Sequence, residues 1–230
     1  MSLNTQTVLI TGGAGEVGEG IVRQFLRAGA TVIVPSRNEE RLSQLRTLLA
    51  DEDTDRLITK QADISSIEGA EALRDEIAEL QHVVASLGGW WQGKPVVELD
   101  LATWHHVIDN GLTAHFIAAR TFLPKIASQA GSSYTMINGG GALNPVPGSG
   151  PVSISAAAQI MLQKVLAAEH QSQPVRVNTL LLATPVKTRA RTQTAPEWVS
   201  ADDAGKYCVY LAQSDTDGET IIFSNSNQTP

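Results

Sequence analysis

Short apolar runs alternate with longer segments of helical periodicity along the whole chain. Each short run is rich in β-branched residues and ends at glycine, proline or polar residues, which is typical of a buried strand. The longer segments carry apolar residues three and four positions apart, which indicates amphipathic helices. We therefore expect strands at 7–11, 31–35, 56–60, 82–86, 133–138, 175–182 and 220–223, and helices at 15–27, 38–49, 66–80, 101–126, 153–170 and 202–212.

Buried strands that alternate with helices predict a parallel sheet covered on both faces. The expected fold is α/β: one Rossmann-type, doubly wound parallel sheet of about seven strands. The chain has 230 residues and shows no repeat or low-complexity segment. We expect a single Rossmann-type domain over residues 1–230.

Composition narrows the function classes. The formal net charge of -7 disfavours binding to nucleic acid or to an anionic membrane surface, because like charges repel. No secretory signal is visible, and no apolar run approaches the length of about 20 residues that spans a bilayer. Cys208 is the only cysteine and reads as a small core residue. A chain without an intrachain disulfide suits the cytoplasm.

A glycine-rich turn joins the first predicted strand to the first predicted helix. Its sequence, residues 11–18, is TGGAGEVG. Glycines at such a turn let the backbone approach a pyrophosphate, and the free N–H groups at the start of the helix favour an anion. A turn in this context predicts a dinucleotide site; the alternative is a purely structural turn. The candidate contacts are Gly12, Gly15, Glu16, Val17 and Gly18.

The end of the second strand bears on the choice of cofactor. An NAD site places an acidic residue there, on the ribose 2′-hydroxyl. This chain has Ser36 and Arg37 instead, and its first carboxylate is Glu39. An arginine pairs with a 2′-phosphate, so NADP fits better than NAD. The alternative is that Arg37 is a solvated residue at the start of a helix.

These features resemble the short-chain dehydrogenase/reductase family over nearly the whole chain. Asp63, followed by Ile64, matches the family aspartate near adenine. The segment Ala85-Ser86-Leu87-Gly88 stands where the family has its Asn-Asn-Ala-Gly motif, and Ser86, Leu87 and Gly88 are candidate cofactor contacts. Against the commoner form of the glycine turn, Glu16 occupies the position of the second glycine. The resemblance also implies a homodimer or homotetramer formed through long helices.

The resemblance fails at the residues that carry the family's chemistry. The family uses an Asn, a Ser and a Tyr-x-x-x-Lys pair. The corresponding positions here are Gly111, Gly139, Val152 and Ala156. The nearest tyrosine, Tyr134, starts the fifth strand, at the end opposite the expected site. Losing a positioned general acid costs about 10²–10⁴ in rate, so we assign no catalytic residue.

Other candidates near the site carry less information. Trp90 and Trp91 follow the fourth strand, where they would contact an unknown small-molecule ligand or serve packing and an interface equally well. Ser153 and Ser155 are interpreted as residues of a helix start. His105, His106 and His115 lack the spacing of metal ligands, so no metal is expected.

The sequence thus favours an NADP(H)-binding, short-chain dehydrogenase/reductase-like pseudoenzyme whose dehydrogenase activity is weakened or lost. It would serve as a cofactor sensor or a partner subunit. One alternative is an active NAD(P)-dependent oxidoreductase in which water or a serine donates the proton. A second alternative is a structural subunit without a ligand.

Overall fold

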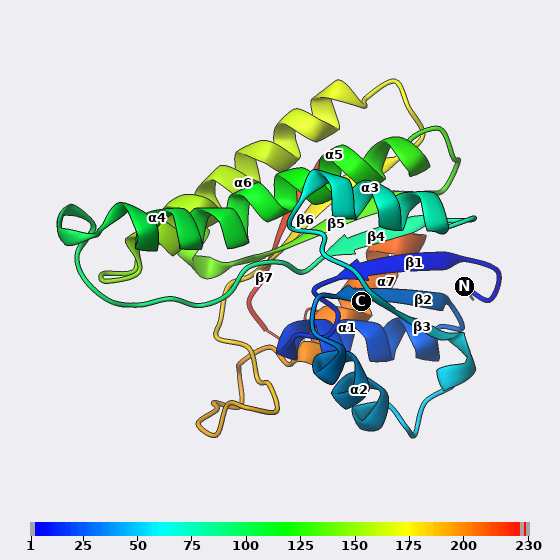
Figure 1. Ribbon diagram of the computed structural model, residues 1–230, viewed down its shortest axis with the longest axis horizontal. Coiled ribbons are helices and arrows are strands. Elements are labelled where there is room, and N and C mark those ends of the chain that lie inside the picture. The colour runs from blue at the N-terminus through cyan, green and yellow to red at the C-terminus, as the bar shows by residue number, and fades with distance from the viewer. Residues whose placement is uncertain (1–2, 226–227, 229–230) are drawn as a thin grey trace.

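The computed structural model describes residues 3–225 and 228; the ends of the expected 1–230 domain lie outside this range. Its centre is one parallel sheet of seven strands in the order β3-β2-β1-β4-β5-β6-β7. The fold predicted from the sequence is therefore confirmed (Figure 1). The strands are β1 Thr7–Thr11, β2 Thr31–Ser36, β3 Leu57–Gln61, β4 His82–Ala85, β5 Ser133–Gly139, β6 Arg176–Leu182 and β7 Thr220–Phe223.

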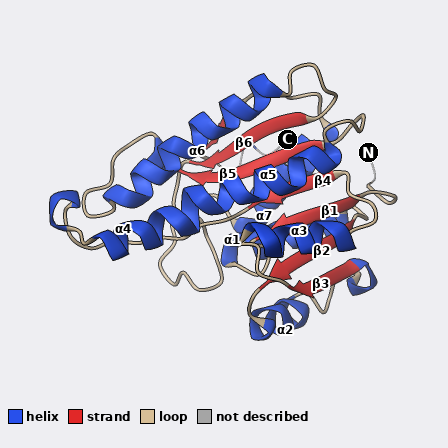
Figure 2. Ribbon diagram, turned by 45° about the horizontal axis from the view of Figure 1, so that its top comes forward, coloured by secondary structure: helices blue, strands red, loops and turns tan. Residues whose placement is uncertain are grey.

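Helices cover both faces of this sheet (Figure 2). One hydrophobic core joins α1, α2 and α7 to the sheet, and a second joins α3 and α5, with the apolar residues of α6 packed against it. The helices are α1 Glu16–Arg27, α2 Glu39–Leu48, α3 Ile67–Glu76, α4 Leu101–Ile108, α5 Ala114–Ile126, α6 Gly150–Glu169 and α7 Ala201–Gln213.

The apolar run of β1 shows why both faces need a cover. Val8 and Ile10 contribute to the first core, whereas Leu9 between them contributes to the second. Successive strand side chains point to opposite faces, so an uninterrupted apolar run fits a strand buried on both sides. All three side chains are fully buried.

The strand order reverses between β1 and β4, which are direct neighbours. In open parallel sheets this reversal opens a crevice beyond the carboxyl ends of the two strands. The glycine turn follows β1, and residues 86–100 follow β4. The topology therefore brings these two segments to one edge of the sheet.

The expected uninterrupted helix at 101–126 is wrong in one detail. A π-helical segment, Asp109–Thr113, separates α4 from α5. Gly111 lies in this segment and is buried, and a Cβ there would be 2.4 Å from Ser155 Oγ of α6. Glycine is a weak helix former, and the close approach of α6 coincides with the irregular turn.

The expectation about apolar length also needs correction. By length and composition, α6 is apolar enough to cross a membrane, with a mean hydropathy of 1.2 over its best window. In the structure it packs beside β5 and β6 (Figure 1). Its buried face carries the polar residues Ser155, Gln159 and Gln163. The helix is thus a layer of the α/β fold.

Candidate functional site

The turn between β1 and α1 requires glycine for steric reasons. Gly12 has a φ of +75°, and a Cβ there would lie 1.9 Å from the Ser86 carbonyl oxygen. A Cβ on Gly18 would lie 2.2 Å from the Gly12 carbonyl oxygen. The turn therefore packs against both the segment after β4 and its own helix start, and larger residues do not fit.

The start of α1 is open to an anion. Gly15 is the N-cap residue and supplies no side-chain cap. The backbone N–H groups of the first helical turn have no partner inside the helix and carry partial positive charge. Such a helix start favours a phosphate group beside it.

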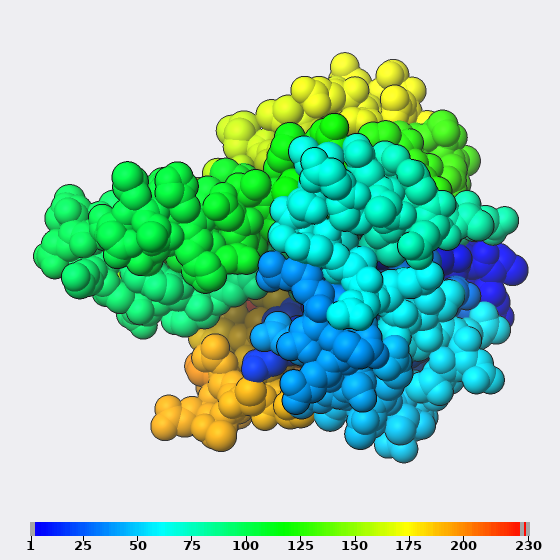
Figure 3. All heavy atoms as spheres, in the orientation of Figure 1, coloured from blue at the N-terminus to red at the C-terminus, as the bar shows by residue number. Residues whose placement is uncertain are grey.

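Two adjoining cavities flank the turn, one of about 600 Å³ and one of about 950 Å³. The surface is hollowed where the projecting segment with α4 meets the segments around α2 and residues 183–200 (Figure 3). Every site residue expected from the sequence lines at least one cavity. Ser36, Arg37, Asp63 and Ile64 line the smaller, Glu16, Val17 and Gly18 the larger, and Gly12, Gly15, Ser86, Leu87 and Gly88 both.

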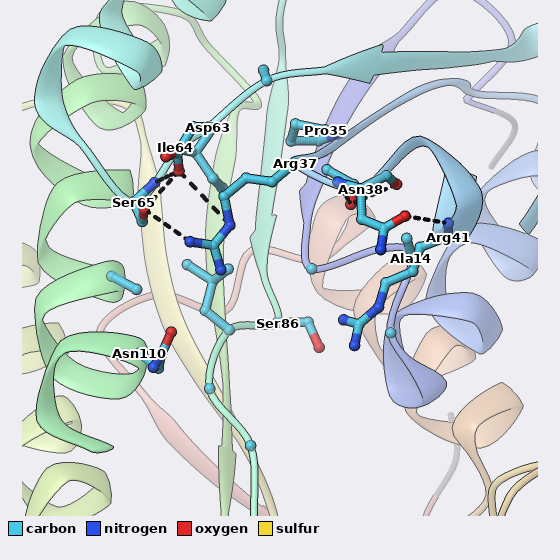
Figure 4. Close-up of a pocket in the computed structure, with 18 of the residues that line it drawn as sticks. Ala14, Pro35, Arg37, Asn38, Arg41, Asp63, Ile64, Ser65, Ser86 and Asn110 are labelled. Carbon is cyan, nitrogen blue, oxygen red and sulfur yellow. Dashed lines mark hydrogen bonds and ion pairs between the residues drawn. The ribbon is translucent and has the colours of Figure 1, made fainter. Parts of the chain in front are cut away.

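Arg37 lies across the smaller cavity from β2 toward the loop after β3 (Figure 4). Its Nε is 3.9 Å from Asp63 Oδ1, and its Nη1 donates to Ser65 Oγ at 3.4 Å. Ser65 in turn donates its hydroxyl and backbone N–H to Asp63. These hydrogen bonds, together with the charge of Arg37, lower the pKa of Asp63. The carboxylate therefore stays ionised and holds Arg37 at the cavity wall.

A second cation at this cavity escaped the sequence analysis. Arg41 lies in the first turn of α2 and lines the smaller cavity, and its guanidinium points into the space (Figure 4). Within the described residues its side chain makes no hydrogen bond or ion pair; only its backbone N–H is used, by the Asn38 cap. Helical side chains lean toward the helix start, a signal that would have placed Arg41 beside Arg37.

The larger cavity brings together the positions that the resemblance marked as catalytic. Gly111, Gly139, Val152 and Ala156 all line it. None of these side chains titrates or donates a hydrogen bond. Buried polar side chains close to them include Ser155 and Gln159, with Gln159 Nε2 donating to Ser155 Oγ at 3.2 Å. Asn138 is also buried there: its Nδ2 donates to the Ala156 carbonyl at 2.8 Å, and its Oδ1 accepts from the Gly139 N–H at 2.7 Å.

The expectation about two nearby serines is wrong. Ser153 and Ser155 do not start a helix: α6 begins at Gly150, so both lie inside it. Proline is favoured in the first turn of a helix, and Pro151 is compatible with a helix that begins before Ser153. Asn110, one residue before Gly111, does not line the larger cavity; its side chain donates to the His106 carbonyl at 2.7 Å and lines the smaller cavity instead.

The carboxylate of Glu16 faces the larger cavity and has a partner. It accepts a hydrogen bond from Thr188 Oγ1 at 2.5 Å. One helical turn later, Glu19 pairs with Arg189 at 3.4 Å. Two contacts thus join the 183–200 segment to the first turn of α1. Sequence reasoning missed Thr188 because 172 residues separate it from Glu16.

Of the remaining candidates, the two tryptophans line a cavity, whereas Tyr134 and Cys208 do not. Trp90 and Trp91 line the smaller cavity, Trp90 also lines the larger, and 64% of Trp90 is exposed. Tyr134 and Cys208 are fully buried away from both cavities, and burial raises the pKa of each. Cys208 is therefore confirmed as a core residue. Among the described residues no group of His, Cys, Asp or Glu has the arrangement of a metal site.

A doubly wound parallel sheet with a glycine turn at its reversal point defines a dinucleotide-binding type of α/β protein. The family model described as short chain dehydrogenase matches residues 6–198. The chain belongs to the short-chain dehydrogenase/reductase family, whose members bind NAD(P).

One curated relative and two solved structures illustrate what the chain is similar to. The chain is 29% identical over 190 residues to the short chain dehydrogenase/reductase dpfgG of Gibberella zeae, which covers 79% of this chain and 70% of that protein. A short-chain type dehydrogenase/reductase from Mycobacterium ulcerans has the same fold, with a TM-score of 0.86 and 22% identity over 96% of this chain and 89% of that one. ElxO with NADP bound has a TM-score of 0.83 and 17% identity over 94% and 96%.

Proposed function

We propose that this protein binds NADP(H) and has weakened or lost dehydrogenase activity, so that it serves as a cofactor sensor or partner subunit. One observation carries the proposal. The cavity beside the glycine turn is lined by Gly111, Gly139, Val152 and Ala156, the positions that the resemblance aligns with the family's catalytic groups. The turn itself fits the cofactor, since Gly12 and Gly18 leave the space that a Cβ would fill.

The chemistry explains why these four residues matter. A bound NADP(H) supplies or accepts a hydride, and a carbonyl that accepts the hydride also needs a proton. None of the four side chains can give or stabilise that proton. Losing a positioned general acid costs about 10²–10⁴ in rate, and losing its electrostatic partners lowers the rate further, though not additively.

The smaller cavity supports NADP rather than NAD. Arg37 and Arg41 both line it at the end of β2, where a dinucleotide-binding fold places the adenosine ribose. Guanidinium groups bind phosphate through charge-assisted hydrogen bonds. Arg37 is already held by Asp63 and Ser65, so the uncommitted Arg41 is the more available partner for a 2′-phosphate. Trp90 and Trp91 then remain to contact a second, unidentified small molecule.

The second copy implied by the resemblance also has structural support. The outer face of α5 and α6 exposes Phe116, Ile154, Met161 and Val165. Exposed apolar residues on two long helices suit burial against an identical face. We propose a homodimer or homotetramer that uses this face. One domain over 1–230 and a cytoplasmic location likewise stay proposals.

An active oxidoreductase with a non-standard proton donor is the second candidate. Ser155 favours it, because its hydroxyl lies at the cavity wall and is fixed by Gln159. The test is a turnover assay with NADPH and a panel of aldehydes and ketones, followed by the absorbance of the reduced nicotinamide. The proposal predicts no turnover above background. Turnover that disappears in Ser155→Ala would establish the second candidate instead.

A further inference from the structure

Glu16 places a negative charge beside the start of α1. It is the first residue of that helix and lines the larger cavity. Its carboxylate accepts a hydrogen bond from Thr188 Oγ1, and the N-cap residue Gly15 offers no side chain to the helix N–H groups. The helix start therefore remains open to an anion, but any phosphate that reaches it meets this carboxylate.

The contact between Glu16 and Thr188 depends on the position of the segment that carries Thr188. Thr188 belongs to the 183–200 segment, which supplies Thr184, Pro185, Val186 and Arg191 to the wall of the larger cavity. This segment is tied together internally, since Lys187 exchanges backbone hydrogen bonds with Val199 and Ala201. Arg191 also lies over the Trp198 ring at 5.6 Å. The Glu16–Thr188 bond thus fastens an ordered wall of the cavity to α1.

We propose that Glu16 determines which ligands the glycine turn accepts, by standing as the chain's own anion at the place of a ligand diphosphate. A diphosphate at the helix start repels the carboxylate and competes for the Thr188 hydroxyl, so it must displace Glu16 from Thr188. Ligands that lack a diphosphate do not meet this barrier. The inference rests on the proposed dinucleotide function and adds a specificity rule to it.

Variants of Glu16 separate charge from shape. Glu16→Gln keeps the length and an acceptor oxygen for Thr188 but removes the charge. We expect it to tighten NADPH binding about tenfold to a hundredfold in a calorimetric titration, the range for removing one like-charge contact near a protein surface. Salt should shrink the difference, because it screens exposed charges. Adenosine 2′-monophosphate, which has no diphosphate, should bind both proteins with affinities within about twofold.

Glu19→Gln is the matched control. Glu19 is also a carboxylate of the first turn of α1 and also holds the 183–200 segment, through Arg189, but it lines neither cavity. It should loosen the segment without changing NADPH affinity. Hydrogen exchange over 184–199 reports the loosening, and in the wild type we expect NADPH itself to raise this exchange as Thr188 is released.

Each outcome has one meaning. Unchanged NADPH affinity in Glu16→Gln, with adenosine 2′-monophosphate still bound, overturns the role of Glu16. Equal tightening of both ligands, or an equal effect in Glu19→Gln, overturns its specificity for the diphosphate. Failure of wild type and Glu16→Gln to bind either ligand overturns the proposed dinucleotide function itself.

Discussion

The hydroxyl of Ser155 occupies the space into which a side chain at Gly111 would extend. A Cβ on Gly111 would lie 2.4 Å from Ser155 Oγ, whereas Ser155 Cβ would be at an ordinary 3.5 Å. The π-helical segment and α6 can therefore approach this closely only because residue 111 is glycine. The resemblance aligned position 111 with a catalytic asparagine, and in this chain the serine takes that room.

Gly111→Ala should therefore destabilise the protein only while Ser155 is present. Overpacking a buried contact costs about 1–3 kcal/mol. In a Ser155→Ala background the clash is gone, and the added alanine should be neutral or stabilise the helix by up to about 1 kcal/mol. Urea unfolding of the two single variants and the double variant measures the coupling. Additive effects would show that the two sites do not share this space.

The two arginines of the smaller cavity should discriminate between cofactors. Arg41→Ala is expected to weaken NADPH binding about tenfold, through loss of a charge-assisted contact to the 2′-phosphate. Arg37→Ala should weaken it less, because Asp63 and Ser65 already hold the Arg37 side chain. NADH, which lacks that phosphate, should bind these variants as it binds the wild type. Parallel titrations measure both. An equal loss for NADH would assign the arginines to another part of the ligand.

Carbonyl reduction with NADPH should increase when proton-donating side chains are placed in the larger cavity. Val152→Tyr combined with Ala156→Lys puts a phenol and an ammonium at two positions of its wall. We expect NADPH-dependent carbonyl reduction to rise by at least about 10²-fold, the typical worth of a positioned acid. Val152→Phe with Ala156→Lys is the control without the hydroxyl. Equal rates in the two double variants would contradict a proton-donor deficit.

Two buried histidines should make stability depend on pH. Burial lowers the pKa of His115, and of His82, to about 4 from the usual 6.5. The unfolded chain thus binds more protons than the folded chain between these values, so stability is full above about pH 6.5 and falls as the pH drops toward 4. Each histidine contributes up to about 3 kcal/mol.

Denaturant unfolding at pH 7 and pH 5 tests this expectation. His115→Leu removes one titrating group, so its loss of stability between the two pH values should be smaller than in the wild type. The difference between the pH values is the readout, because the substitution itself changes packing at both. An identical pH dependence in the variant would show that His115 is not the buried base.

Much of this architecture follows from local sequence. The runs at 7–11 and 220–223 form strands with the expected bounds. The first is an apolar, β-branched run buried on both faces, which has few alternatives. The second is an edge strand in which Ile222 is 51% exposed. The glycine turn predicted one wall of the site for a steric reason, because only glycine fits at position 12. Helix ends were less predictable, since the helix expected from Ser153 begins at Gly150.

The rest depends on contacts between distant residues. Nothing near Glu16 in the sequence indicates Thr188, and nothing near Gly111 indicates that Ser155 fills its space. The π-helical segment is set by this packing rather than by helix propensity, which gives only a weak preference. Arg41 was missed because it reads as one polar residue among many in a solvated helix.

A calorimetric titration of the purified protein with NADPH and with NADH tests the central claim most directly. We predict that NADPH binds, and that it binds about tenfold more tightly than NADH, because Arg37 and Arg41 line the cavity in which we propose that the 2′-phosphate lies. Absence of binding by either nucleotide would contradict the account and leave a structural subunit without a ligand as the remaining explanation.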